Sequence, residues 1–211
     1  STISQTLVNN DNVTRQVVYS VMMSLNGCTA GPTNFNVTVY PQAAVTTVPT
    51  TATICSGSAF NLALTSNVAG ATYTWTANST VGVSGFSGGS GNSINQTIIN
   101  STNAPASVTY TVTPSANGCP GTPRDYTVTV NPIPDLTLSL ANQTICSGTA
   151  ITPVTFSSSV AGTTYLWTAT PSGAGITGYI ASGAASIPAQ VINSTLSVQG
   201  TVTYTVTPRY A

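Results

Sequence analysis

The chain has 211 residues and a formal net charge of zero, and only 3% of its residues are charged, against about 25% in an ordinary soluble domain. It contains three arginines and three aspartates but no lysine, glutamate or histidine. This composition excludes a Ser-His-Asp or Cys-His catalytic arrangement, a loop of clustered calcium-binding carboxylates and the basic surface that nucleic-acid binding requires. No apolar run of about 20 residues is present, so we expect no membrane span. We expect a non-enzymatic chain without cofactor, metal or nucleic acid.

Short stretches in which apolar residues alternate with threonine predict half-buried strands along the whole chain. Threonine occupies 39 positions, and as a β-branched residue it fits the solvent face of a strand without adding charge. In the best-defined part of the chain the expected strands lie, in order, near residues 45–50, 59–65, 72–77, 94–99, 107–114 and 124–131, with weaker ones in 80–90. A loop with Asn-Gly at 115–123 joins the last two, and the Gly-rich stretch 85–91 is expected to be a loop.

An internal repeat of about 91 residues defines the organisation of the chain. Cys28 and Cys119 are 91 residues apart, and so are Cys55 and Cys146. Whole motifs recur at the same or a slightly longer spacing: Asn26-Gly27-Cys28 as Asn117-Gly118-Cys119, Thr53-Ile54-Cys55-Ser56-Gly57 as Thr144-Ile145-Cys146-Ser147-Gly148, and Val108 to Pro114 unchanged as Val202 to Pro208. The chain therefore reads as successive copies of one all-β, immunoglobulin-like sandwich module.

The repeat divides the chain into three expected parts. Residues 1–42 match only the C-terminal part of a sandwich repeat, residues 43–132 a complete repeat, and residues 133–211 a repeat that lacks its last strand. Two interpretations stay open. The sequence is a segment of a longer protein, or it is a subunit whose open end is completed by a free strand of another chain.

The four cysteines recur with the module, which favours disulfide bonding over free thiols and implies an oxidising compartment. Within the complete repeat, Cys55 and Cys119 are the expected pair, at one end of the sandwich. Cys28 and Cys146 are then expected to be unpaired within this chain or paired outside it. Trp75 and Trp167 are expected to be core aromatics, with a sugar-binding platform as the alternative.

Five motifs in this order resemble the PKD-like, immunoglobulin-like repeats of giant Bacteroidetes surface proteins such as the gliding-motility adhesins. The motifs are Thr53 to Gly57, Gly70 to Trp75, Val108 to Pro114, Asn117-Gly118-Cys119 and Val128-Thr129-Val130-Asn131-Pro132. The resemblance covers essentially the whole chain. It implies a β-sandwich, a location outside the cell or on its surface, and in many such proteins export by the type IX system. It supplies no catalytic residues.

The leading functional expectation is structural: tandem sandwiches that form an extended extracellular filament, stalk or adhesin. The expected partners are neighbouring repeats of the same protein or identical subunits joined head to tail. The alternatives are a module that binds a surface or glycan ligand, and a spacer attached to a secreted enzyme.

Overall fold

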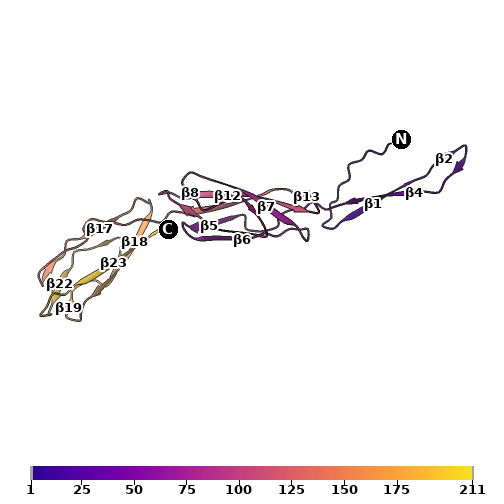
Figure 1. The fold of residues 1–211 in the computed structure, drawn as a ribbon. Helices are drawn as coiled ribbons and strands as arrows, with labels where there is room; N and C mark the ends of the chain where they lie inside the picture. The colour runs from indigo at the N-terminus through magenta and orange to yellow at the C-terminus, as the bar shows by residue number, and fades with distance from the viewer. Residues whose placement is uncertain (1, 211) are drawn as a thin grey trace. The chain divides into compact units, whose positions relative to one another are not determined.

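The structure, a computed structural model, describes residues 2–210 and consists of β-strands, turns and loops (Figure 1). The chain forms two compact units, Ser1–Ile99 with Ser107–Thr129, and Asn100–Ala106 with Val130–Ala211. Among the described residues no helix is long and apolar enough to cross a membrane. We call residues 43–132 the middle repeat and residues 133–210 the third repeat, after the division expected from the sequence.

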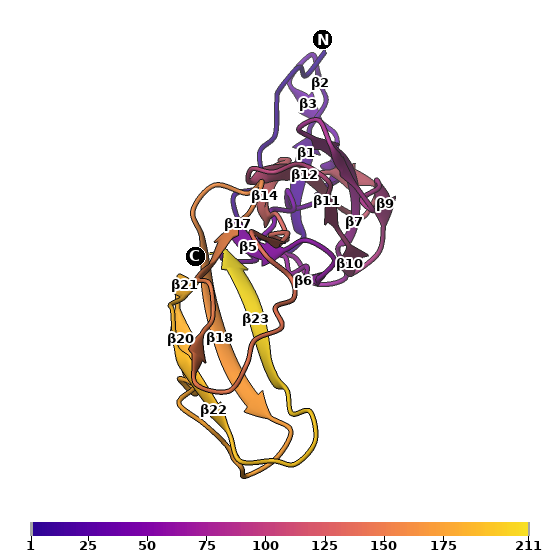
Figure 2. The ribbon, with the colours of Figure 1, turned by 90° about the vertical axis from the view of Figure 1, so that its left-hand side faces the viewer.

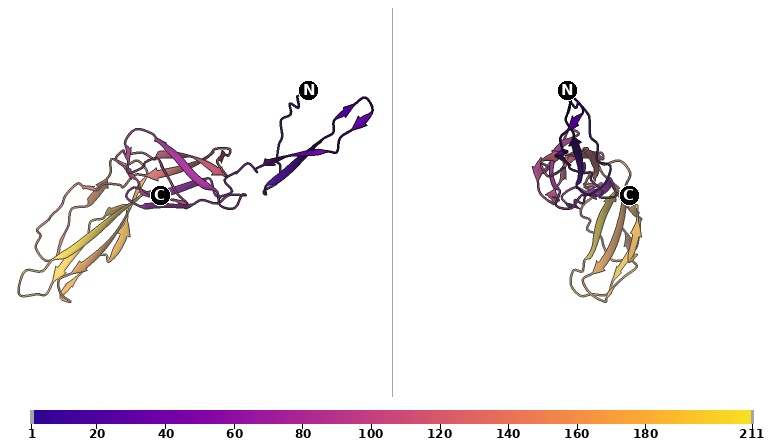
Figure 3. Two further views of the ribbon diagram at one scale, coloured as in Figure 1. Left: turned by 45° about the vertical axis from the view of Figure 1, so that its right-hand side comes forward. Right: turned by 90° about the vertical axis from the view of Figure 1, so that its right-hand side faces the viewer.

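The N-terminal part contains a long hairpin in which β1 (Arg15–Val21) pairs antiparallel with β4 (Thr33–Val39) (Figure 3). Two short strands, β2 (Ser24–Leu25) and β3 (Cys28–Thr29), continue the hairpin to its tip. Asn26 and Gly27 form the turn with φ angles of 49° and 81°, the left-handed conformation that two-residue hairpin turns require. The β1–β4 sheet has only these two strands, so most of its side chains are exposed.

The middle repeat is a two-layer sandwich. One sheet has the strand order β5-β14-β12-β7-β9, with β13 paired to β12, and the other strands form the pairs β6–β10 and β8–β11. The strands are β5 (Thr51–Cys55), β6 (Ala59–Ala63), β7 (Thr72–Ser79), β8 (Val83–Ser84), β9 (Gly89–Ser90), β10 (Ser93–Thr97), β11 (Ile99–Asn100), β12 (Ala106–Ala116), β13 (Cys119–Pro120) and β14 (Arg124–Asn131).

The core of the middle repeat follows directly from the alternation in its sequence. On β12, Val108, Tyr110 and Val112 are 0% exposed, while the threonines between them point to the other face and are half-buried. Tyr126 lies on the adjacent β14 and is buried in the same way, and Phe60 stacks on Tyr110 with ring centroids 5.6 Å apart. Each such buried side chain stabilises the fold by about 1.5–3 kcal/mol.

The chain enters the middle repeat beside the strand on which it ends. The bridge between Ala44 and Thr122 is parallel, and further along the amide of Thr127 donates a hydrogen bond to the carbonyl of Thr50 at 2.9 Å. The first and last segments of the repeat therefore advance in the same direction, from one end of the sandwich to the other.

The third repeat repeats this architecture with shorter sheets. Its sheets have the orders β20-β18-β23, β15-β17-β21 and β16-β22-β19, and Figure 2 shows β20, β18 and β23 side by side. The strands are β15 (Thr137–Leu138), β16 (Thr149–Ala150), β17 (Val154–Ser157), β18 (Thr163–Pro171), β19 (Ile176–Thr177), β20 (Ser182–Ala184), β21 (Ser186–Ile187), β22 (Val191–Ser194) and β23 (Val202–Tyr210).

The prediction of an all-β chain of immunoglobulin-like sandwich repeats is confirmed. One expected strand is wrong: residues 45–50 do not form the first strand of the middle repeat, because β5 begins at Thr51. After the bridge from Ala44 to Thr122, the chain lies against the other sheet, where Val45 bridges Ser66, and it pairs with β14 only near Thr50. The division at residues 42/43 and 132/133 stays a prediction.

Candidate functional site

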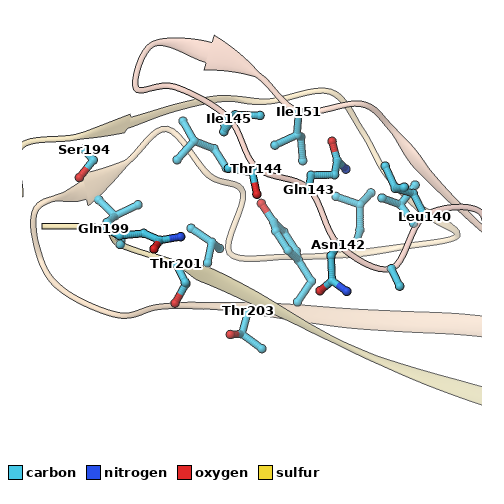
Figure 4. A pocket seen from close by; sticks show the side chains of 18 of the residues that line it. Leu140, Asn142, Gln143, Thr144, Ile145, Ile151, Ser194, Gln199, Thr201 and Thr203 are labelled. Carbon is cyan, nitrogen blue, oxygen red and sulfur yellow. The ribbon is translucent and has the colours of Figure 1, made fainter.

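One concave feature of the third repeat is a groove of about 780 Å³ between β23 and the stretch 142–146 (Figure 4). We call it the third-repeat groove. Figure 4 shows Thr144 and Ile151 on one side of it and Thr201 and Thr203 on the other. Polar side chains at its rim include Asn142, Gln143, Thr144, Ser147, Ser194, Gln199, Thr201 and Thr203. The apolar lining consists mainly of Leu138, Leu140, Ile145, Ile151, Val154, Ile176, Ile187, Ile192, Val202, Tyr204 and Val206.

The floor of the groove is the hydrophobic core itself. Ile151, Val154, Trp167 and Ile187 form the buried cluster of the third repeat. Three of them, Ile151, Val154 and Ile187, also line the groove. Tyr204 packs against this cluster but stays only partly buried, so the groove opens the core of the sandwich toward solvent.

One seven-residue sequence occurs in both repeats and shows what differs between them. Val108 to Pro114 lies in β12, which is paired on both edges, to β7 and to β14. The identical sequence Val202 to Pro208 lies in β23, which among residues 2–210 is paired on one edge, to β18. Val108, Tyr110 and Val112 are 0% exposed, whereas their counterparts in β23 are only partly buried. The groove therefore lies at the position that β14 takes in the middle repeat.

The other wall of the groove shows the same difference. Thr53-Ile54-Cys55 belongs to β5, which pairs with β14. The identical Thr144-Ile145-Cys146 is in no strand, and Ile145 is 37% exposed. A strand forms only where a partner supplies hydrogen bonds to its edge, so this stretch stays irregular beside the groove.

The groove is lined by apolar and uncharged polar side chains. Its titratable groups are Cys146 and Tyr204. The Tyr204 hydroxyl donates a hydrogen bond to Oε1 of Gln190 at 3.2 Å; burial raises the pKa of Tyr204, and this hydrogen bond offsets part of the rise. An apolar floor beside an unpaired strand edge is the arrangement that binds an added β-strand.

The same tyrosine–glutamine contact occurs in the middle repeat, where sequence reasoning missed it. Tyr110 donates to Oε1 of Gln96 at 2.6 Å, and Gln96 in turn donates to the carbonyl of Ser87 at 2.9 Å. The signal is present in the sequence, because tyrosine and glutamine recur together at a spacing of 94 residues, Gln96 as Gln190 and Tyr110 as Tyr204. These glutamines orient the phenol groups of Tyr110 and Tyr204.

The predicted disulfide between Cys55 and Cys119 is not supported. From the level at which Thr127 pairs with Thr50, Cys55 lies five residues farther along, whereas Thr122 and then Cys119 lie in the opposite direction. At about 3.3 Å per residue, Cys55 lies about 16 Å to one side of this level and Thr122 about 16 Å to the other, so the two cysteines lie at opposite ends of the repeat, more than about 30 Å apart. A disulfide needs Cα atoms about 4.4–6.8 Å apart.

All four cysteines are free and exposed in the structure. Cys28 lies at the tip of the N-terminal hairpin, in β3, and Cys146 precedes the turn that leads into β16. Cys28 and Cys119 occupy equivalent hairpin positions, next to Asn-Gly turns with positive φ. The expected pairing of Cys28 and Cys146 outside the chain stays a prediction.

The aromatic and glycine-rich motifs serve the core. Trp75 is 9% exposed and Trp167 is 3% exposed, so neither forms a sugar-binding platform. Their indole N–H groups donate to the carbonyls of Ser87 and Ser186 at 3.2 and 3.0 Å. The stretch 85–91 contains the short strand β9 and wraps around Trp75, because a Cβ on Gly89 would lie 2.9 Å from that ring.

The charged groups contact neighbouring polar groups and do not gather. Arg15 pairs with Asp11 on the surface of the N-terminal hairpin segment. The hydroxyl of Ser158 and the amide of Ser159 donate to Asp135, and these hydrogen bonds, that from Ser158 first, lower the pKa of this carboxyl. Within residues 2–210, no group of three or more acidic, cysteine or histidine side chains could hold a metal ion.

Comparison with known proteins gives one family and one structural likeness. The family described as PKD-like domain matches residues 1–43, 52–134 and 143–211. No curated protein matches. Among solved structures, the extracellular cadherin domains 1–4 of protocadherin gamma B7 align with 8% identity and a TM-score of 0.33 over 94% of this chain. The chain spans 57% of that protein chain.

Proposed function

Because the chain belongs to the PKD-like domain family, we propose that it is a non-catalytic repeat segment of an extracellular filament, stalk or adhesin at a cell surface. The observation that carries this proposal is the recurrence of one neutral sandwich: the family matches three successive stretches of the chain, and two of them fold with the same core contacts. Serial copies of a small stable unit suit a load-bearing or spacing element.

The polar chemistry of the repeats supports a structural role. Among the described residues, no buried side-chain nitrogen or oxygen lacks a hydrogen-bond partner. The solvent faces of β12 and β23 are covered mainly by threonine, and the one charged side chain on them is that of Arg209. With a 3% charged sequence that lacks histidine, lysine and glutamate, the chain has few groups for general acid–base catalysis.

Single-molecule force spectroscopy of the full chain tests the mechanical part of the proposal. We expect discrete unfolding events, and complete unfolding of the roughly 90-residue middle repeat should release up to about 300 Å of chain. Extension at low force without discrete events would contradict a load-bearing role.

The adhesive alternative has its own candidate residue. Tyr40 directly follows β4 and is 45% exposed, which makes it an accessible aromatic side chain. A glycan-binding assay on the full chain, with Tyr40→Ala beside it, separates the two functions. Saturable binding that this substitution abolishes would favour a ligand-binding module. Absence of binding would favour the structural role. A spacer beside a secreted enzyme is the other function that requires no glycan binding.

We extend the proposal to location and source. The motif order resembles repeats of giant Bacteroidetes surface proteins, many of them exported by the type IX system, and this resemblance supports a surface location. An antibody raised against the full chain should label intact cells of the source organism. Labelling only after the cells are broken would refute the surface location, and continued labelling in a strain without type IX export would refute that route.

A further inference from the structure

We propose that the segment 43–47 and the stretch 122–126 of the middle repeat form a mechanical clamp, the contact that holds the repeat closed when the chain is pulled at both ends. We call this contact the entry clamp. Arg124 and Tyr126 supply its two side-chain hydrogen bonds. The inference rests on the proposed load-bearing role and deepens it, because it names the hydrogen bonds that carry the load.

The direction of the two segments decides how a stretching force acts on them. The segment 43–47 lies where the chain enters the repeat, and the parallel bridge between Ala44 and Thr122 shows that the last segment runs beside it in the same direction. Tension along the chain pulls the segment 43–47 back toward the entry end and pulls β14 toward the opposite end. The hydrogen bonds between them are therefore sheared together, and bonds that share a load resist more force than bonds that open one after another.

Three successive hydrogen bonds cross the entry clamp. The donors are the amide of Thr122, a guanidinium N–H of Arg124 and the hydroxyl of Tyr126, and the acceptors are, in the same order, the carbonyls of Ala43, Val45 and Thr47, at 3.3, 2.9 and 3.0 Å. Each donor follows its acceptor by 79 residues, so the three bonds keep one register. Side chains thus bridge the two segments over the stretch where the first one lies against the other sheet.

The opposite edge of the segment 43–47 is bonded to that other sheet. The amide of Thr46 donates to the carbonyl of Thr65 at 2.9 Å, and the amide of Asn67 donates to the carbonyl of Ala44 at 3.3 Å. The Ala44 amide in turn donates to Oδ1 of Asn67 at 2.7 Å. Because the segment is held along both edges, its release under load requires the bonds on both edges to break.

The surroundings strengthen the two side-chain bonds. Tyr126 is 2% exposed, and the guanidinium carbon of Arg124 lies 5.9 Å from the centroid of its ring. Both bonds are partly buried, and a hydrogen bond in a less polar environment is stronger than one in water. Gly121 allows the two segments to approach closely, because a Cβ at this position would clash with the carbonyl oxygen of Ala43.

Single-molecule force spectroscopy of the full chain at constant force tests the entry clamp. Tyr126→Phe removes the hydroxyl that donates to Thr47 and keeps the buried ring. If this bond bears load, it is broken when the repeat reaches its unfolding transition state, so its loss destabilises only the folded repeat. We expect the middle repeat, identified by its released length, to unfold about fivefold faster at the same force. Arg124→Met removes a charged donor and should accelerate unfolding more than about tenfold.

Tyr110→Phe is the matched control. It removes a buried tyrosine hydroxyl of the same repeat, and the bond of this hydroxyl to Gln96 lies outside the entry clamp. Both tyrosine substitutions should lower the free energy of unfolding in urea, but Tyr110→Phe should leave the rate of unfolding under force unchanged.

Two results would overturn the clamp and leave the load-bearing role standing. One is an equal acceleration by Tyr126→Phe and Tyr110→Phe. The other is a discrete unfolding event whose rate neither Tyr126→Phe nor Arg124→Met changes. A chain that extends without discrete events would overturn the load-bearing role and the clamp together.

Discussion

Val112→Ala and Val206→Ala make the same change in the same seven-residue sequence, in two different surroundings. Val112 is 0% exposed in β12, which is paired on both edges, whereas Val206 is partly buried beside the open groove. Removal of two buried carbons costs about 1.6 kcal/mol in transfer free energy, and the cavity left in a closed core adds about 1 kcal/mol. We therefore expect a loss of about 2.5 kcal/mol for Val112→Ala and about 1 kcal/mol for Val206→Ala.

The assay must report the stability of each repeat separately. Hydrogen exchange followed by mass spectrometry at increasing urea resolves peptides of β12 from peptides of β23 in the full chain.

Equal costs for the two substitutions would refute this reasoning. That result would mean that Val206 is as well enclosed in solution as Val112.

Three further predictions concern the cores and the cysteines. Burial raises the pKa of Tyr110 to about 12, whereas in the unfolded state its pKa is near 10. Between these two pH values the phenol keeps its proton in the folded state and loses it in the unfolded state. The free energy of unfolding of the middle repeat, measured with urea, should therefore be constant below pH 9 and fall by about 2 kcal/mol between pH 10 and 12. Gly183→Ala places a methyl group 2.5 Å from a ring carbon of the buried Trp167 and should lower the thermal midpoint of unfolding. Gly173→Ala is the control and should not lower this midpoint, because the nearest atom to its methyl group is 3.7 Å away. Peptide mapping of the non-reduced chain should recover no peptide that links Cys55 to Cys119.

The repeat and the alternation make most of the fold predictable. Tyr110 and Val112 can be assigned to a core from the threonines that separate them, because a strand places successive side chains on opposite faces. The recurrence of Val108 to Pro114 as Val202 to Pro208 is sufficient to place β23. Such local signals are sufficient where each residue's face depends only on its neighbours in the chain.

Features that depend on partners distant in sequence could not be predicted. The amide of Thr46 donates to the carbonyl of Thr65, whereas the carbonyl of Thr50 accepts a hydrogen bond from Thr127 of β14. The sequence around these two threonines does not show this difference, and so the alternation places the first strand too early. The pairing of Cys55 with Cys119 fails for a related reason: the spacing of two cysteines does not show at which end of a sandwich each one lies. The segments that form the walls of the groove can be predicted from the repeated motifs. That no strand lies between these walls depends on contacts distant in sequence and could not be predicted.

The position of the cysteines at opposite ends of the middle repeat has a consequence for when the repeat can fold. Its core closes without any covalent link between Cys55 and Cys119, so folding does not wait for an oxidant and should proceed equally in a reducing compartment. Any disulfide that either thiol forms afterwards must reach a partner outside the repeat. A disulfide formed by Cys55 or by Cys119 would then identify a thiol that lies next to that end of the folded repeat.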